Sequence, residues 1–105
     1  WRNAYFVRNG QLYTVAERIR SRVFLAQGNL CDDEVLRRTY DLIMCRNVII
    51  YLKAEVRNRV IATLHRHLAP SSYLMLGHAE IIRERTLFEY QGNSVYRRQA
   101  KATNV

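Results

Sequence analysis

The order of apolar runs along the chain predicts a strand, a helix and a second strand. Residues 40–45 (YDLIMC) contain a continuous apolar run, which is typical of a strand buried on both faces of a parallel sheet. Apolar positions then recur at helical spacing over residues 54–68, and Pro70 ends this element because its ring cannot continue a helix. Residues 73–76 (YLML) predict another buried strand. The order favours a βαβ unit.

The first third of the chain is divided by turn residues. Asn9-Gly10 lies between two aromatic and apolar runs in residues 5–14 (YFVRNGQLYT), a pattern that predicts a β-hairpin. Residues 22–26 (RVFLA) predict a short strand, which Gly28 ends. Asp32 and Asp33 indicate a turn or the start of a helix of one or two turns over residues 34–38.

The last third predicts a closing pair of strands. Ser71-Ser72 is expected to form a turn, and Gly77 allows a bend after the strand at 73–76. Residues 87–90 and 94–97 flank Gln91-Gly92-Asn93, which predicts a hairpin. The chain contains no repeats and no low-complexity linker, so we predict no domain boundary within it.

Composition places the chain among globular proteins of one domain. It has 105 residues, 49% of them hydrophobic and 25% charged, and one core is the limit for this length. No apolar run reaches the roughly 18 residues of a membrane span, so we expect a cytoplasmic protein without membrane insertion. Cys31 and Cys45 lack CxxC spacing, which argues against a disulfide framework. Because the chain opens on Trp1, we expect a fragment of a longer protein.

The net charge of +8 suggests a partner that is acidic. A nucleic-acid-binding protein concentrates basic residues in a patch or run. Here the arginines occur singly or in pairs along the chain, as at Arg37-Arg38 and Arg97-Arg98, which favours a solvated surface over a nucleic-acid site. A small basic module that binds nucleic acid or an acidic partner remains the alternative function.

Polar residues follow two of the predicted strands. Asn29 comes after the strand at 22–26, and Arg46-Asn47 come after the strand at 40–45. Ligands of open α/β sheets bind outside the carboxyl ends of the strands, and an asparagine can both donate and accept hydrogen bonds there. From the residues alone, an Asx turn or a loop cap is the favoured interpretation of each asparagine.

Four motifs in order resemble the chemotaxis receptor methyltransferases. YDLIMCRNVIIYL is similar to the family signature FCRNVxIYF, and VFLAQGNL to its strand ending in Asn-Leu. LAPSSYLMLGHAE stands in place of LxPGGxLxLGHSE, and FEYQGNSVYRR resembles the terminal strand. Two departures from the family are Ser71-Ser72 in place of Gly-Gly and Ala79 in place of Ser. The resemblance covers nearly the whole chain.

The resemblance implies a fold, a cofactor and a set of site residues. The fold is α/β, the C-terminal half of a Rossmann-like methyltransferase sheet (residues 22–105) with the remnant of a small antiparallel β-subdomain (residues 1–21). The function implied is S-adenosylmethionine-dependent O-methylation of glutamate side chains on receptors. Asn29 and Leu30, with Arg46 and Asn47, would contact S-adenosylmethionine, and Tyr51 would lie near the methyl group and the incoming carboxylate.

This chemistry requires no catalytic base and no metal. A glutamate is already ionised at neutral pH, so orientation is the main task. The Tyr51 hydroxyl is a candidate for aiming one carboxylate oxygen, and its alternative role is that of a half-buried aromatic at the start of the helix. His78 and Glu80 suggest metal or acid-base chemistry that this reaction does not need, so His78 is assigned a structural role. His65 and His67 diverge on the predicted helix.

Part of the family's cofactor pocket is not present in this sequence. It has no glycine-rich loop and no following acidic residue for the ribose. We therefore expect the 105-residue polypeptide alone to bind the cofactor weakly or not at all. Without the central strand of the sheet, the strand at 22–26 would present an unpaired apolar edge, which predicts self-association.

Overall fold

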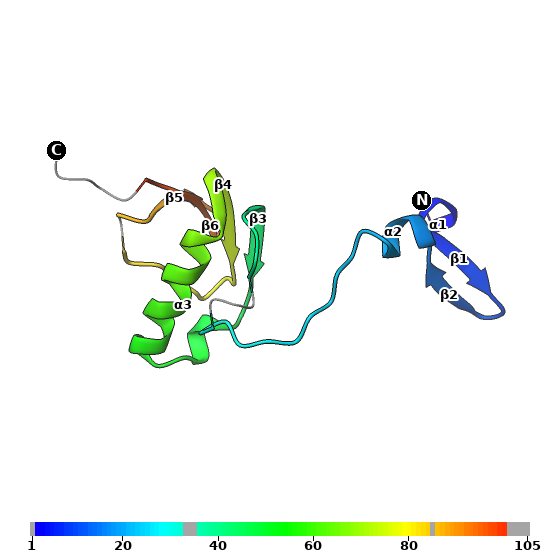
Figure 1. The fold of residues 1–105 in the computed structure, drawn as a ribbon, viewed down its shortest axis with the longest axis horizontal. Helices are drawn as coiled ribbons and strands as arrows, with labels where there is room; N and C mark the ends of the chain where they lie inside the picture. Colours follow the sequence, from blue (N-terminus) through cyan, green and yellow to red (C-terminus); the bar gives the residue numbers. More distant parts are fainter. Residues whose placement is uncertain (1, 33–35, 85, 101–105) are drawn as a thin grey trace.

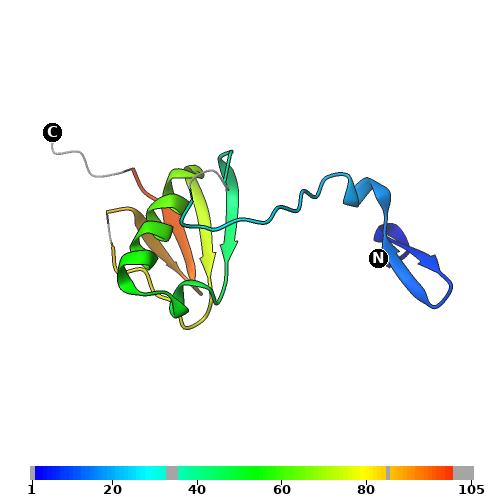
Figure 2. The ribbon, with the colours of Figure 1, turned by 60° about the horizontal axis from the view of Figure 1, so that its bottom comes forward.

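The computed structural model describes residues 2–32, 36–84 and 86–100 and shows a mixed α/β unit and a separate two-stranded sheet (Figures 1 and 2). An extended segment joins the two. In chain order the elements are α1 (Arg2–Tyr5), β1 (Phe6–Asn9), β2 (Leu12–Val15), α2 (Glu17–Arg20), β3 (Tyr40–Cys45), the 3-10 helix η1 (Ile49–Tyr51), α3 (Ala54–Arg66), β4 (Leu68–Leu76), β5 (Phe88–Gly92) and β6 (Val95–Arg98). No helix among the described residues is long and apolar enough to cross a membrane.

The predicted N-terminal hairpin is confirmed. Strands β1 and β2 pair antiparallel, with Asn9 opposite Leu12. The two residues of the turn are therefore Gly10 and Gln11, one position later than the Asn9-Gly10 pair. Gly10 has a φ of +67°, and glycine adopts such an angle at little cost. Its place as the first turn residue suits the short loops that match the twist of paired strands.

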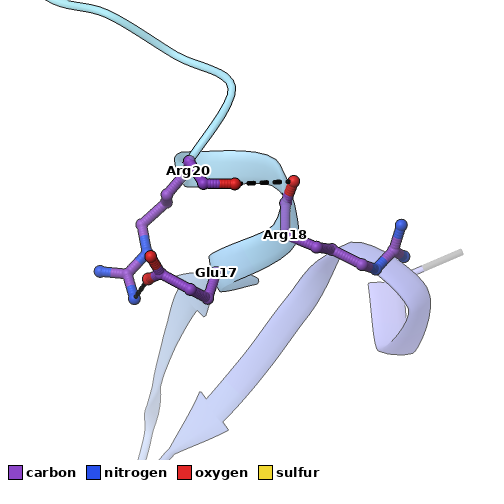
Figure 3. Close-up of polar contacts among 4 residues, drawn as sticks. Glu17, Arg18 and Arg20 are labelled. Atoms are coloured by element: carbon purple, nitrogen blue, oxygen red, sulfur yellow. Dashed lines mark hydrogen bonds and ion pairs between the residues drawn. The ribbon is translucent and has the colours of Figure 1, made fainter.

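Helix α2 is held to the preceding segment through Arg18. Its side chain extends from α2 towards α1 (Figure 3). There the guanidinium donates a hydrogen bond to the Ala4 carbonyl and lies 5.4 Å from the centre of the Tyr5 ring. Arg20 and Glu17 form an ion pair of 2.6 Å on the same helix. Both of its side chains are mostly exposed, so this pair adds little to stability.

The strand predicted at residues 22–26 is not formed. Residues 23–29 have no regular secondary structure, and Phe24 and Leu25 are each about nine-tenths exposed. A strand exists only where a neighbouring backbone accepts and donates its hydrogen bonds, and no described strand pairs with this segment. Of the short helix predicted at 34–38, residues 34 and 35 lie outside the described residues and residues 36–38 are not helical.

The larger sheet has the strand order β3-β4-β6-β5. Strands β3 and β4 are parallel, and their ends coincide because Cys45 is opposite Leu76. Strand β6 runs antiparallel to both β4 and β5, which confirms the predicted closing hairpin. Its turn has positive φ angles at both Asn93 and Ser94, as tight hairpin turns require.

Helix α3 covers one face of this sheet and makes the core with it (Figures 1 and 2). The least exposed hydrophobic side chains come from α3, η1, β4 and the closing hairpin: Ile49, Val60, Leu64, Leu68, Leu74, Leu76, Phe88 and Tyr96. Each buried leucine of this kind removes enough apolar surface from water to contribute about 1.5–3 kcal/mol.

The prediction that β3 is buried on both faces is wrong. Cys45 is buried and Ile43 is half-buried, but Leu42 is 52% exposed and Met44 59% exposed. Successive side chains of a strand point to opposite faces, and α3 covers only the face of Ile43 and Cys45. Strand β4 shows the same alternation, with Leu74 and Leu76 buried and Tyr73 exposed.

The boundary between α3 and β4 also differs from the prediction. The helix begins at Ala54 as predicted but ends at Arg66, and β4 begins at Leu68. Pro70 therefore lies inside β4, and the turn expected at Ser71-Ser72 is an irregularity of that strand. Ser71 has a φ of +62°, and the register between β3 and β4 shifts across this segment.

Candidate functional site

The carboxyl ends of β3 and β4 lie side by side and are followed by polar residues. Arg46 and Asn47 come directly after β3, and Gly77 and His78 directly after β4. Arg46, Asn47 and His78 are exposed. This is the carboxyl end of the parallel pair β3–β4, and ligands of open α/β sheets bind at such strand ends. The predicted Arg-Asn pair lies there.

A buried carboxylate joins the two strand ends. Glu80 is only 4% exposed. Its Oε1 accepts hydrogen bonds of 2.7 Å from the backbone N–H groups of Asn47 and Gly77, and its Oε2 accepts one of 3.0 Å from the N–H of Ile50. Both oxygens are thus used, and the loop after β3 is fixed to the loop after β4.

The backbone around this carboxylate is closely packed. Asn47 has a φ of +61°, an angle that asparagine tolerates better than most residues. A Cβ on Gly77 would lie 2.7 Å from Glu80 Oε1 and 2.9 Å from the Asn47 nitrogen. Position 77 therefore requires glycine, because the loop after β3 and the Glu80 carboxylate occupy the space that a Cβ would need.

The hydrogen bonds decide the ionisation of Glu80. Burial alone would raise the pKa of its carboxyl, but the backbone N–H groups of Gly77, Asn47, Ile50 and Ile49 outweigh burial and hold the pKa below its ordinary value. Burial, and secondarily the charge of Glu80, raises the pKa of the Cys45 thiol. Glu80 is consequently charged and Cys45 neutral at physiological pH, and neither Cys31 nor Cys45 is in a disulfide.

Tyr51 is the last residue of η1, immediately before the loop that leads into α3. Its side chain is 83% exposed, so the alternative role of a half-buried aromatic packed at the helix start is not supported. An exposed phenol beside the carboxyl ends of the strands can donate a hydrogen bond to a molecule that approaches from solvent.

Asn29 and Leu30 lie in the segment between α2 and β3. Asn29 Oδ1 accepts a hydrogen bond of 2.9 Å from the Cys31 N–H, which is the Asx turn that the residues alone favoured. Leu30 packs against the core and lines an open hollow of about 580 Å³ together with Ile43, Met44, Cys45, Arg46, Val48, Leu36 and Leu64. The structure therefore brings Leu30 and Arg46 to one hollow, whereas Asn29, Asn47 and Tyr51 are not among the residues that line it.

A second hollow, of about 640 Å³, lies beside the closing hairpin and is lined in part by Glu84, Glu89, Tyr90 and Tyr96. It contains none of the five predicted site residues. The hollow at β3 is the better candidate for a ligand because its wall is mainly apolar with one cationic side chain, its volume suits a small molecule, and it lies at the carboxyl end of a parallel strand.

The remaining histidines bind backbone groups. The His65 ring lies 2.8 Å from the Gln99 carbonyl and edge-on to Phe88, and the His67 ring lies 2.9 Å from the Arg38 carbonyl. Among the residues that the structure describes, no group of three or more histidine, cysteine or acidic side chains could hold a metal ion.

Comparison with known families decides the assignment of the chain. The profile of the family described as CheR methyltransferase, SAM binding domain, matches residues 1–97. The chain belongs to this CheR methyltransferase family. S-adenosylmethionine (SAM) is the cofactor of that domain, so the match favours a methyltransferase over the alternative of a small basic binding module.

Curated relatives agree with the CheR assignment. A chemotaxis protein methyltransferase of Borreliella burgdorferi is 33% identical over 87 residues, which are 82% of this chain and 31% of that protein. Chemotaxis protein methyltransferase 1 of Pseudomonas aeruginosa is 39% identical over 70 residues, 67% of this chain and 26% of that protein. A probable biofilm formation methyltransferase WspC of Pseudomonas putida is 35% identical over 82 residues, 76% of this chain and 19% of that protein. The chain thus spans a third or less of the length of these relatives.

The role of Glu80 is not predicted by its sequence motif. GHAE suggests metal or acid-base chemistry, whereas the partners of this carboxylate are backbone groups as many as 33 positions away. A glycine directly after a buried strand, with a carboxylate three residues later, was the signal available. This pattern indicates that two backbone segments approach closely after the strand, and that a nearby carboxylate could accept hydrogen bonds from their N–H groups.

Proposed function

We propose that the protein containing this chain is a protein-glutamate O-methyltransferase that modifies methyl-accepting receptors of chemotaxis-type signalling in the cytoplasm. The observation that carries the proposal is the hollow at the carboxyl end of β3, which Leu30 and Arg46 both line. It lies in a chain of the CheR methyltransferase family. Residues 22–105 would be the C-terminal half of the catalytic fold, and residues 1–21 the remnant of its β-subdomain.

The residues around the hollow would divide the work of binding the cofactor. Leu30 supplies apolar surface for a flat ring, and Asn29, the residue before it, would offer its amide from outside the wall. Arg46 and Asn47, on the fixed loop after β3, supply hydrogen-bond donors to polar groups. A pocket that is mainly apolar with a few oriented polar groups is the usual form of a cofactor site.

The acceptor would approach past Tyr51. When bound, SAM would supply a methyl group on a sulfonium, to which an oxygen of the ionised glutamate would bond as the carbon–sulfur bond breaks and its electron pair passes to sulfur. No proton needs to be removed, because the acceptor carboxylate is charged at neutral pH. The Tyr51 hydroxyl orients one carboxylate oxygen.

Methyl transfer to receptor glutamates tests this function in the full-length protein. We expect incorporation of methyl groups that mild alkali releases, as an ester requires. Arg46→Ala should raise the Kd for SAM about tenfold or more, because a hydrogen bond from a charged donor contributes about 1.5–3 kcal/mol. Absence of SAM binding by the full-length wild-type protein would overturn the proposal.

Tyr51→Phe tests the acceptor side separately. We expect a lower kcat with little change in the Kd for SAM, since the hydroxyl is assigned to the acceptor. Tyr73→Phe is the matched control, because Tyr73 is also exposed but lies within β4 rather than at the strand ends. An unchanged kcat in Tyr51→Phe would remove the hydroxyl from the mechanism.

The isolated 105-residue polypeptide should bind SAM weakly or not at all. Its sequence has no glycine-rich loop for the methionine part of the cofactor and no following acidic residue for the ribose. Titration calorimetry with the polypeptide measures this directly. Micromolar binding would show that the groups around the hollow suffice.

A further inference from the structure

We infer that Glu80 is a positioning residue of the proposed site: its carboxylate holds the loop of Arg46 and Asn47, and the turn that ends in Tyr51, in the arrangement used for cofactor and acceptor. The inference rests on the proposed function. It concerns a group that would touch neither the cofactor nor the acceptor.

The geometry requires both side-chain oxygens of Glu80 to be hydrogen-bond acceptors. Oε1 receives the N–H groups of Asn47 and Gly77 at 2.7 Å each, and Oε2 receives that of Ile50 at 3.0 Å. Backbone N–H donors cannot become acceptors, so both side-chain atoms that face them must present a lone pair. An ionised carboxylate is the one common side chain that does this at two atoms, and its charge strengthens every bond.

The anchored donors belong to the segment that carries the site residues. The N–H of Asn47 is bound directly, and Arg46 precedes it. Ile50 lies in η1, where it is followed by Tyr51. The carboxylate therefore fixes the backbone from which all three side chains extend.

The same contacts explain how an unfavourable backbone angle is kept. Asn47 adopts a φ of +61°, which is a sparsely populated region for residues other than glycine. Such angles persist where surrounding contacts over-determine them, and they cluster at functional sites. The bond from the Asn47 N–H to Glu80 is one of these contacts, and Gly77 leaves the space in which it forms.

Two variants of the full-length protein separate charge from shape. Glu80→Gln keeps the shape but presents one acceptor oxygen, so an NH₂ group must face at least one of the three backbone donors. Glu80→Asp keeps both acceptor atoms and the charge but is shorter by one methylene. Glu89→Gln is the matched control, because Glu89 is exposed on β5 and is remote in sequence from both strand ends.

The measurements are the Kd for SAM by calorimetry, kcat with receptor substrate and Tm, with binding and activity measured well below the Tm of each variant. We expect Glu80→Gln to raise the Kd at least tenfold and to lower kcat, Glu80→Asp to restore part of both, and Glu89→Gln to change neither. A positioning role requires these changes in molecules that remain folded.

Three results would overturn the inference. One is a Glu80→Gln protein with lowered Tm but wild-type Kd and kcat, which would make the carboxylate merely structural. Another is that Glu80→Gln fails to fold, while Glu80→Asp folds and has the wild-type Kd and kcat. The third is failure of both variants to fold, which would assign the carboxylate to the fold. Loss of SAM binding by the wild-type protein would instead refute the proposed function.

Discussion

Replacing Gly77 with alanine tests how tightly the two strand ends are joined. The added Cβ would lie 2.3 Å from Asn47 Oδ1, 2.7 Å from Glu80 Oε1 and 2.9 Å from the Asn47 nitrogen. The Asn47 side chain can rotate away, but the other two atoms are fixed by backbone and by three hydrogen bonds. At least one bond to the Glu80 carboxylate must therefore lengthen or break.

The cost of this substitution can be worked from its parts. Overpacking by one methyl typically costs about 1–3 kcal/mol, and a hydrogen bond to a charged group contributes about 1.5–3 kcal/mol. Since the two losses overlap, we expect about 2–4 kcal/mol of lost unfolding free energy. For a chain of this size that is at least about 8 °C in Tm.

Urea unfolding followed by circular dichroism measures the loss, with the slope m expected to be unchanged. Gly10→Ala is the control: nothing lies within 4 Å of its added Cβ, so its cost of about 1 kcal/mol comes from the positive φ alone. A loss below about 0.5 kcal/mol for Gly77→Ala would refute the reasoning, because it would show that the strand ends separate easily.

Three further predictions concern other features. Ser71→Gly should stabilise the chain by about 0.5–1 kcal/mol in urea unfolding, because a φ of +62° strains serine and not glycine; destabilisation would show that the serine side chain matters. Since the folded pKa of Glu80 lies below its ordinary value near 4.5, its contribution is complete above that pH and is lost as pH falls through the folded pKa. The stability difference between wild type and Glu80→Gln should therefore shrink below about pH 4, with Cys45 neutral throughout, and a constant difference would contradict the assignment. Self-association was expected at the strand 22–26, which is not formed, but β3 is an edge strand of the described sheet, so the 105-residue polypeptide should still self-associate in sedimentation as concentration rises. Met44→Lys should weaken this because Met44 is exposed on β3; a wild type that stays monomeric would count against it.

Local patterns predicted the elements that are stabilised by local contacts. The start of α3 at Ala54 and both bounds of β3 follow from the spacing of apolar residues, and the two hairpins follow from their turn residues. The end of α3 was placed two residues too late, because nothing in the sequence distinguished Leu68 as the last helical residue from Leu68 as the first residue of β4.

Features that depend on contacts between distant parts of the chain could not be predicted from such local patterns. An apolar run shows that a strand seeks burial but not which faces are covered, and so Leu42 and Met44 were wrongly expected to be buried. The prediction of a strand at 22–26 was wrong for the same reason, because a strand forms only where another strand pairs with it, and the segment itself does not show whether one does. For the candidate site, the sequence indicated Arg46 and Asn47 at a strand end, but the carboxylate of Glu80 that fixes them could be seen only in three dimensions.

The topology of the sheet has a consequence for the order in which it assembles. The β5–β6 hairpin closes a short loop, and such hairpins form within about 1–10 μs. Strand β3 pairs only with β4 among the described strands, and this pairing must wait until η1 and α3 have formed the connection, because long loops close at a greater entropic cost. Strand β3, which directly precedes Arg46 and Asn47, should accordingly join last and open first in native-state hydrogen exchange. A ligand bound at its end would then slow exchange across β3 while leaving the closing hairpin unaffected.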